Sequence, residues 1–140
     1  MEAPFVAGDE ATGRAFLDLI RPYVYLPEFG PDRIREARKM KARIERERIA
    51  PSEDPEFHMK LGSGGMSDVE FTVQLLQLRH GGADESLRNP GTLPSISALQ
   101  SAGLLTSVES ETLTASYEFC SLVRNRLYLQ AGRTRDSLPS

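Results

Sequence analysis

The sequence predicts an all-α fold, a helical bundle of about five helices. Apolar residues recur at helical spacing in successive segments, and several of these segments begin or end at typical capping residues. No stretch of useful length alternates apolar with polar residues, as a half-buried strand would. The chain has 140 residues, which is the size of one domain, so we expect residues 1–140 to form a single helical domain.

Composition narrows the functional classes. The hydrophobic content of 39% is typical of a soluble globular protein, and no apolar run approaches the roughly 20 residues that cross a bilayer. The first residues lack the basic and apolar regions of a signal peptide. One cysteine, Cys120, excludes an internal disulfide and suits a reducing cytoplasm. The net charge of −3 does not predict a nucleic-acid or membrane partner.

The first predicted helix follows Asp9, which is a suitable N-cap. Pro22 falls inside its pattern and should kink or end it. Its apolar face consists of Phe16, Leu17, Ile20, Tyr23 and Val24. Pro31 then suits the first turn of a second helix. The apolar face of that helix consists of Ile34, Ala37, Met40 and Ile44.

The second helix is highly charged. Eight of the seventeen Lys and Arg residues lie between Arg33 and Arg48, where acidic residues are interspersed and aromatic residues are lacking. Such a mixture is typical of a solvated helix face with salt bridges, and it favours that interpretation over a nucleic-acid site.

A loop over residues 50–65 leads into a central helix that is apolar on nearly all sides. Ser67 and Glu70 have the spacing of a capping box at its start, and Gly81-Gly82 is a suitable end. A helix this apolar belongs in the middle of a bundle. Its narrow polar strip must face a partner or a cleft, because burying unpaired polar groups is costly. The strip consists of Ser67, Glu70, Gln74 and Gln77.

Two further helices complete the bundle. A short one opens at Gly91 and stops at Gly103. Thr106 and Glu109 form a second capping box, and Gly132 is the expected stop of the helix that they begin. The apolar stripe of this last helix consists of Leu113, Tyr117, Cys120, Val123 and Leu127.

The Gly-rich turn before the central helix allows two interpretations. The segment Gly62–Gly65 could hold a phosphate at a helix N-terminus. It lacks the Lys-Ser/Thr ending of a P-loop and follows no strand, so its spacing favours a plain turn. His58 and His80 have no metal-ligand spacing to each other or to Cys120, and we expect no metal site.

Asp68 and Glu70 are the sharpest candidates for a functional site. Both can be N-terminal acids favoured by the helix dipole, with Glu70 also closing the cap. Alternatively, one or both lie beside a cleft and bind a cation, a ribose or a basic partner. Lys60 and Arg79 could then supply positive charge for a phosphate. Arg79 lies on the same helix flank as Asp68, through Thr72 and Leu75.

The residues from Lys60 to Leu78, KLGSGGMSDVEFTVQLLQL, resemble the signature of the helical domain of glutamine synthetase adenylyltransferases. PII uridylyltransferases share this domain type and are the nearest alternative. Other segments resemble the same domain or the connection that precedes it: Phe5–Asp9, Leu87–Leu93, Ala102–Leu105 and Val123–Arg126. One departure is Ser63, where the family leads us to expect a basic residue that would help to grip phosphate.

The resemblance implies an enzyme that moves AMP from ATP to a tyrosine of glutamine synthetase and removes it by phosphorolysis, which regulates nitrogen assimilation. It implies that ATP and magnesium act in a separate nucleotidyltransferase domain, because no Gly-Ser turn here leads into paired aspartates. The chain then resembles a fragment with no catalytic residue and no transfer activity of its own. The segment Thr72–Leu76 and the tail from Arg133 to Pro139 favour the adenylylating half of such an enzyme.

Two roles for such a fragment follow from the resemblance. In one, the domain closes the back of the nucleotidyltransferase cleft of its own enzyme through Lys60, Asp68, Glu70 or Gln74. In the other, it is a protein-interaction module that docks glutamine synthetase or a PII signalling protein.

Overall fold

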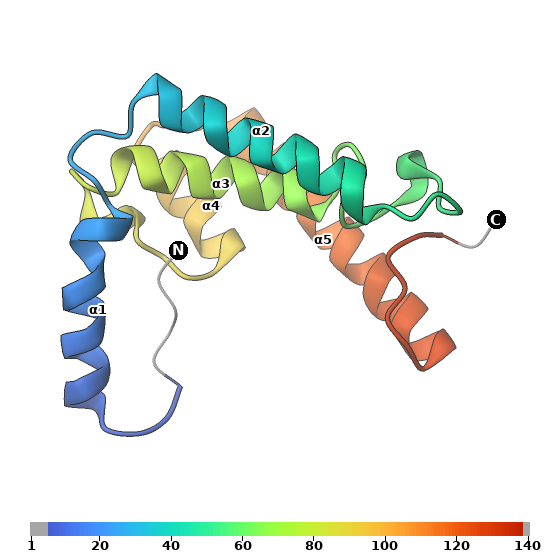
Figure 1. The fold of residues 1–140 in the computed structure, drawn as a ribbon, viewed down its shortest axis with the longest axis horizontal. Coiled ribbons are helices and arrows are strands. Elements are labelled where there is room, and N and C mark those ends of the chain that lie inside the picture. Colours follow the sequence, from blue (N-terminus) through green and yellow to red (C-terminus); the bar gives the residue numbers. More distant parts are fainter. Residues whose placement is uncertain (1–5, 139–140) are drawn as a thin grey trace.

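The computed structural model describes residues 6–138 and is all-α in this range. The described residues form five α-helices, with two short 3₁₀ helices in the connections (Figure 1). The helices are α1 (Glu10–Val24), α2 (Pro31–Arg48), α3 (Met66–His80), α4 (Thr92–Ser101) and α5 (Ser107–Ala131), and the 3₁₀ helices are η1 (Pro55–Phe57) and η2 (Glu85–Leu87). The predicted all-α class and the number of helices are confirmed.

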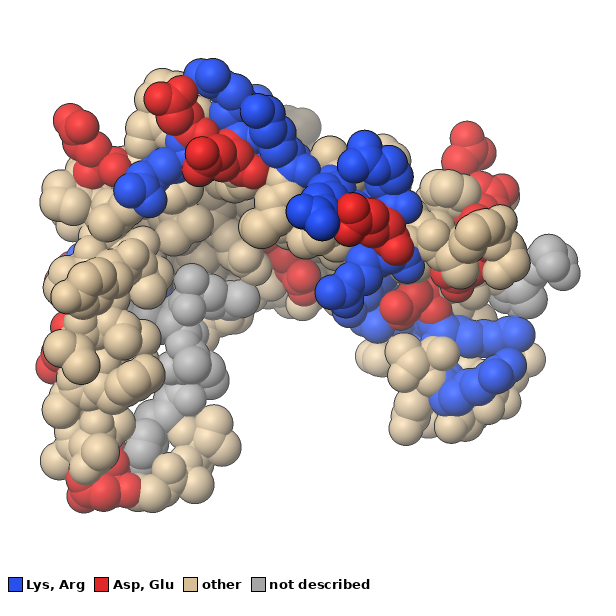
Figure 2. Space-filling model, in the orientation of Figure 1, with Lys and Arg blue, Asp and Glu red and all other residues tan. Residues whose placement is uncertain are grey.

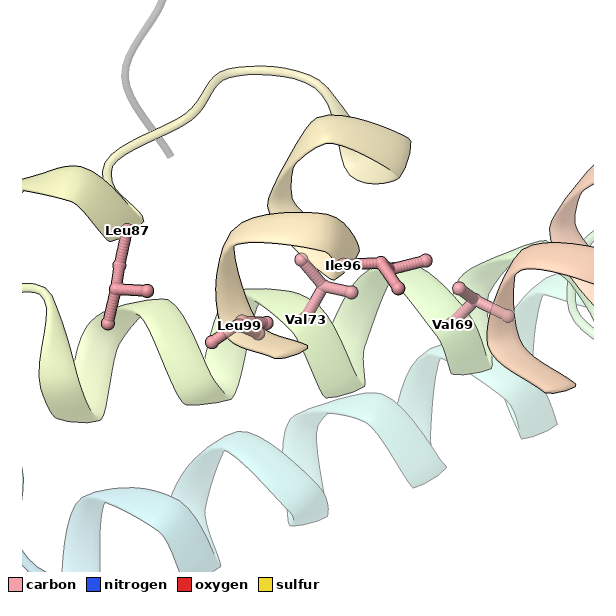
Figure 3. Packing of buried hydrophobic residues seen from close by; sticks show 5 residues of the cluster. All are labelled: Val69, Val73, Leu87, Ile96 and Leu99. Carbon is pink, nitrogen blue, oxygen red and sulfur yellow. The ribbon is translucent and has the colours of Figure 1, made fainter. Parts of the chain in front are cut away.

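Helix α3 lies at the centre of the arrangement, as its apolar sequence predicts. It packs against α4 and α5, and α2 runs beside it on another side (Figure 1). Val69 and Val73 of α3 meet the most buried residues of the neighbouring segments (Figure 3). These five core side chains are no more than 2% exposed: Val69, Val73, Leu87, Ile96 and Leu99.

The buried amide of Gln77 joins α3 to the segment that leads into α4. Its side chain is 1% exposed, and its Nε2 atom donates to the carbonyl oxygens of Leu87 (2.7 Å) and Asn89 (2.8 Å). The same nitrogen lies 2.9 Å from the hydroxyl of Ser95. Gln77 was expected to face a partner or a cleft, and its partner is this internal set of oxygens.

Several predicted helix ends are confirmed. Asp9 caps α1, because its carboxylate accepts from the amide of Thr12 (2.7 Å). Thr106 and Glu109 form a complete capping box at α5. Gly132 ends α5 with φ +64°, a left-handed conformation that glycine adopts without strain. Pro22 lies inside α1, and the helix ends two residues later at Val24.

The capping box predicted from Ser67 and Glu70 is wrong. Helix α3 begins at Met66, its N-cap is Gly65, and Ser67 is a buried residue of the first turn. The reason is a contact that sequence spacing does not show. The backbone before the helix folds onto residues 59 and 60, so the amides of Met66 and Ser67 donate to the carbonyl oxygens of Met59 and Lys60.

Helix α1, like α2, has no buried residue within the described part of the chain. Its sequence is strongly amphipathic, yet Phe16 is 58% exposed and Tyr23 is 79% exposed. It projects from one end of the α2–α3 layer, and the last part of α5 projects from the other (Figure 1). None of the described helices is long and apolar enough to cross a membrane.

We predict that Val73→Asp unfolds the domain and that Arg43→Ala does not. Val73 is 2% exposed, and an unpaired buried carboxylate is among the costliest single changes. The side chain of Arg43 is 70% exposed and pairs with Glu47 on its own helix, so its loss should change stability by about 0.5 kcal/mol or less. Thermal melts followed by circular dichroism compare the two variants. Equal melting temperatures would show that α3 does not occupy the centre of the fold.

Candidate functional site

The backbone amides of the Gly-rich turn at the start of α3 donate hydrogen bonds to groups of the same chain. Gly62 donates to the carbonyl of His58 (2.8 Å), Gly65 to that of Gly62 (2.9 Å), and Gly64 to the carboxylate of Asp68 (2.6 Å). Gly64 has φ +75°, and a Cβ on Gly62 would lie only 2.3 Å from the carbonyl oxygen of Pro55. Both positions therefore require glycine for the shape of the turn. These amides are not free to hold a phosphate, which supports the plain-turn interpretation.

Asp68 connects three parts of the fold. One carboxylate oxygen accepts from the amide of Gly64, and the other forms an ion pair with Lys41 of α2. Lys41 also pairs with Glu45, and both Lys41 and Asp68 are mostly buried at their side chains. Burial lowers the pKa of Lys41, but hydrogen bonds and charge interactions with Asp68 and Glu45 outweigh this effect and raise the pKa above its usual value. Asp68 thus holds α2 against the start of α3.

Of the other sequence-predicted site residues, Arg79 shares a groove with Asp68 and Lys60 lines a different hollow. Arg79 lines the same groove as Asp68, as their shared helix flank predicts. Lys60 instead lines a hollow on the other side of the Gly-rich turn, beside His58 and Asp136.

Glu70 and Gln74 are both half-buried, and Glu70 makes no ion pair within residues 6–138. At roughly 100° per residue, Glu70 lies about 160° and Gln74 about 120° around the helix from Asp68. The two acids of the central motif therefore face different surroundings. A single cleft contacts one of them and not both.

Comparison with known proteins identifies the family. The family model described as GlnD PII-uridylyltransferase matches residues 36–140, which is three quarters of the chain. The chain belongs to this family. It is also similar over its whole length to bifunctional glutamine synthetase adenylyltransferase/adenylyl-removing enzymes, with 47% identity to that of Streptomyces avermitilis and 46% to that of Streptomyces coelicolor. The enzyme of Mycobacterium leprae is 39% identical over 99% of the chain.

The resemblance predicted from the motif at Lys60–Leu78 is therefore confirmed. The chain spans about 14% of the length of these curated relatives. In this GlnD-family domain, the motif residues have structural roles that the geometry explains. Val69 and Val73 form the core, Gln77 binds the segment before α4, and the glycines and Asp68 shape the turn into α3.

His58 organises the loop before the turn, and the sequence analysis missed this role. Its ring is 4% exposed, and Nδ1 accepts from the amides of Leu61 (3.0 Å) and Lys60 (3.3 Å). The nearest carboxylate oxygen of Glu53 lies 3.9 Å from Nε2. A lone histidine in a loop carries no sequence signal for such a role, because its partners are backbone groups.

The C-terminal tail fastens this loop to α5. Asp136 accepts from Arg124 of α5 (2.6 Å), and its carbonyl oxygen accepts from the amide of Met59 (2.7 Å). Arg124 belongs to the Val123–Arg126 motif, so this contact gives one residue of that motif a structural role. Pro139, the end of the tail used in the sequence analysis, lies outside the described residues, as does Phe5.

Cys120 lies in the core, as its apolar stripe predicts, and is 7% exposed. Burial raises the pKa of its thiol above the usual value, and the nearby charge of Arg124 opposes this effect only in part. The thiol therefore stays protonated and unreactive near neutral pH. Among residues 6–138, no three His, Cys, Asp or Glu side chains are grouped closely enough to hold a metal ion.

We predict that the Lys41–Asp68 pair contributes more stability than an exposed pair on the same helix. A double-mutant cycle of Lys41→Met and Asp68→Asn should give a coupling energy of about 1–2 kcal/mol, because both side chains are largely shielded from water. The matched control is the Arg43–Glu47 pair, whose exposed groups should couple by less than about 0.5 kcal/mol. Denaturant unfolding measures both cycles, and equal coupling energies would contradict the proposed anchoring of α2.

Proposed function

We propose that this chain is the helical domain of a bifunctional glutamine synthetase adenylyltransferase. The observation that carries the proposal is the 47% identity over the whole chain to an enzyme of that name. In the proposed parent enzyme, AMP is transferred from ATP to a tyrosine of glutamine synthetase and is removed by phosphorolysis. The matched region is about 14% of the relative, so the remaining length is available for a nucleotidyltransferase domain.

In this proposal the domain supports catalysis without performing it. ATP and magnesium bind in the nucleotidyltransferase domain, and the isolated fragment transfers no AMP. The enzyme acts in the cytoplasm. The contacts at the start of α3 favour this structural role, because the amides of the Gly-rich turn and the carboxylate of Asp68 are already bonded within the domain.

A second candidate is a helical domain of the PII uridylyltransferase type. It is favoured by the description of the matching family model, which names PII-uridylyltransferase. The parent enzyme would then modify a PII protein with UMP instead of glutamine synthetase with AMP. Supplying the full-length enzyme with ATP and glutamine synthetase, or with UTP and PII protein, distinguishes the two candidates by the product that forms.

Within the full-length enzyme, we propose that Glu70 contacts the nucleotidyltransferase domain, whereas Asp68 acts through the fold. Glu70 is half-buried and has no ion-pair partner within residues 6–138, while Asp68 already holds Lys41 and Gly64. This sharpens the expectation that at least one of the two acids has an interdomain role.

The test is the turnover of full-length Glu70→Gln and Asp68→Asn at saturating ATP. We expect Glu70→Gln to lose at least about tenfold in turnover, equivalent to about 1.4 kcal/mol in the barrier, because it keeps the shape and removes the charge. Asp68→Asn should lower the melting temperature and keep most of the turnover. If Glu70→Gln turns over at the wild-type rate, the proposed interdomain role of Glu70 is wrong.

A further inference from the structure

A groove runs between α2, α3 and the connection from α4 to α5. Its volume is about 590 Å³, and its apolar floor consists of Phe71, Leu75, Leu76, Leu104 and Leu105. Arg38 of α2 and Arg79 of α3 line it as well. At one end it adjoins a second hollow of about 410 Å³, which shares Ile34, Arg38 and Arg79. Together the two hollows offer a surface that is apolar at its base and basic beside it.

The two arginines of the groove lack ion-pair partners in the part of the chain that the structure describes. This distinguishes them from their neighbours on α2, since Arg35 pairs with Asp32 (2.8 Å) and Arg43 pairs with Glu47 (2.9 Å). Lys and Arg residues gather along the exposed face of α2, so the groove lies beside a basic ridge (Figure 2).

The acidic residues that line the groove do not neutralise these arginines. The carboxylate of Asp68 pairs with Lys41, and that of Glu109 accepts the amide of Thr106 (2.8 Å) in the capping box of α5. The hydrogen bonds from the amide and hydroxyl of Thr106 lower the pKa of Glu109, so it stays ionised in its capping role. The groove therefore keeps two guanidinium groups available for carboxylates.

The combination favours a peptide over a nucleotide. Five apolar side chains at the floor provide a site for an apolar anchor residue, and guanidinium groups bind carboxylates in bidentate fashion. Guanidinium groups also bind phosphates, but the floor is apolar, and the amides at the start of α3 that could assist a phosphate are bonded within the domain.

We propose that this groove docks an acidic segment of glutamine synthetase that carries an apolar anchor residue. The inference rests on the proposed function, because that function supplies the protein partner. Arg38 and Arg79 bind the carboxylates of the segment, and its apolar side chain fills the floor between Phe71 and Leu105.

The test uses the full-length enzyme, purified glutamine synthetase and the charge reversals Arg38→Glu and Arg79→Glu. We expect each to raise the Kd for glutamine synthetase at least about tenfold, with the KM for ATP unchanged and the effect reduced at high salt. Arg33→Glu is the matched control, because Arg33 is exposed on α2 and does not line either hollow. It should leave the Kd within about twofold of wild type.

Arg38→Gln and Arg79→Gln serve if a charge reversal impairs folding, and each should raise the same Kd by about threefold or more. An unchanged Kd in the folded variants, or a raised KM for ATP with an unchanged Kd, overturns the docking proposal. A wild-type enzyme that transfers no AMP to glutamine synthetase would instead refute the proposed function.

Discussion

The fold depends on one buried amide beside the apolar core. Gln77 lies on α3 among residues that are almost fully buried, and its Nε2 reaches the segment that carries η2 and the start of α4. Apolar contacts alone permit α4 to slide along α3, because contacts between aliphatic side chains have little directional preference. Hydrogen bonds to Leu87 and Asn89 fix the register of this segment, because they end on two particular backbone carbonyl oxygens and have directional geometry.

Polar contacts attach the outer elements of the fold to this core. Asp68 holds α2 and the Gly-rich turn, while His58 and Asp136 hold the loop before the turn and the tail after α5. These contacts determine where the groove beside α2 lies and which arginines it presents. The motif that marks the family is thus mainly a description of how α3 is buried and begun.

The sequence was sufficient to predict what depends on neighbours along the chain. The five helices, the cap at Asp9, the box at Thr106 and the stop at Gly132 follow from local spacing, and the structure confirms them. The sequence was insufficient where backbone groups far along the chain determine the local structure. Ser67 has the spacing of a cap, yet the turn folds back onto residues 59 and 60, and the N-cap is Gly65, two residues earlier.

In the candidate site, too, features set by local spacing were predictable and contacts between distant segments were not. The shared flank of Asp68 and Arg79 follows from helical spacing, and the structure places both in one groove. The pairing of Asp68 with Lys41 does not follow from spacing, because the two residues belong to different helices. The buried His58 was missed for the same reason, since its partners are backbone amides of a loop.

The most direct test of this account compares Gln77→Leu with Gln74→Leu in thermal and denaturant unfolding. Both changes replace an amide on α3 by an aliphatic group, and Gln74 is the half-buried control. We predict that Gln77→Leu costs about 2 kcal/mol, although it makes the core more apolar, because it removes the two hydrogen bonds that Nε2 donates to the carbonyl oxygens of Leu87 and Asn89. Gln74→Leu should stay within about 0.5 kcal/mol of wild type. Equal stability of the two variants would contradict the claim that the Gln77 amide fixes the core.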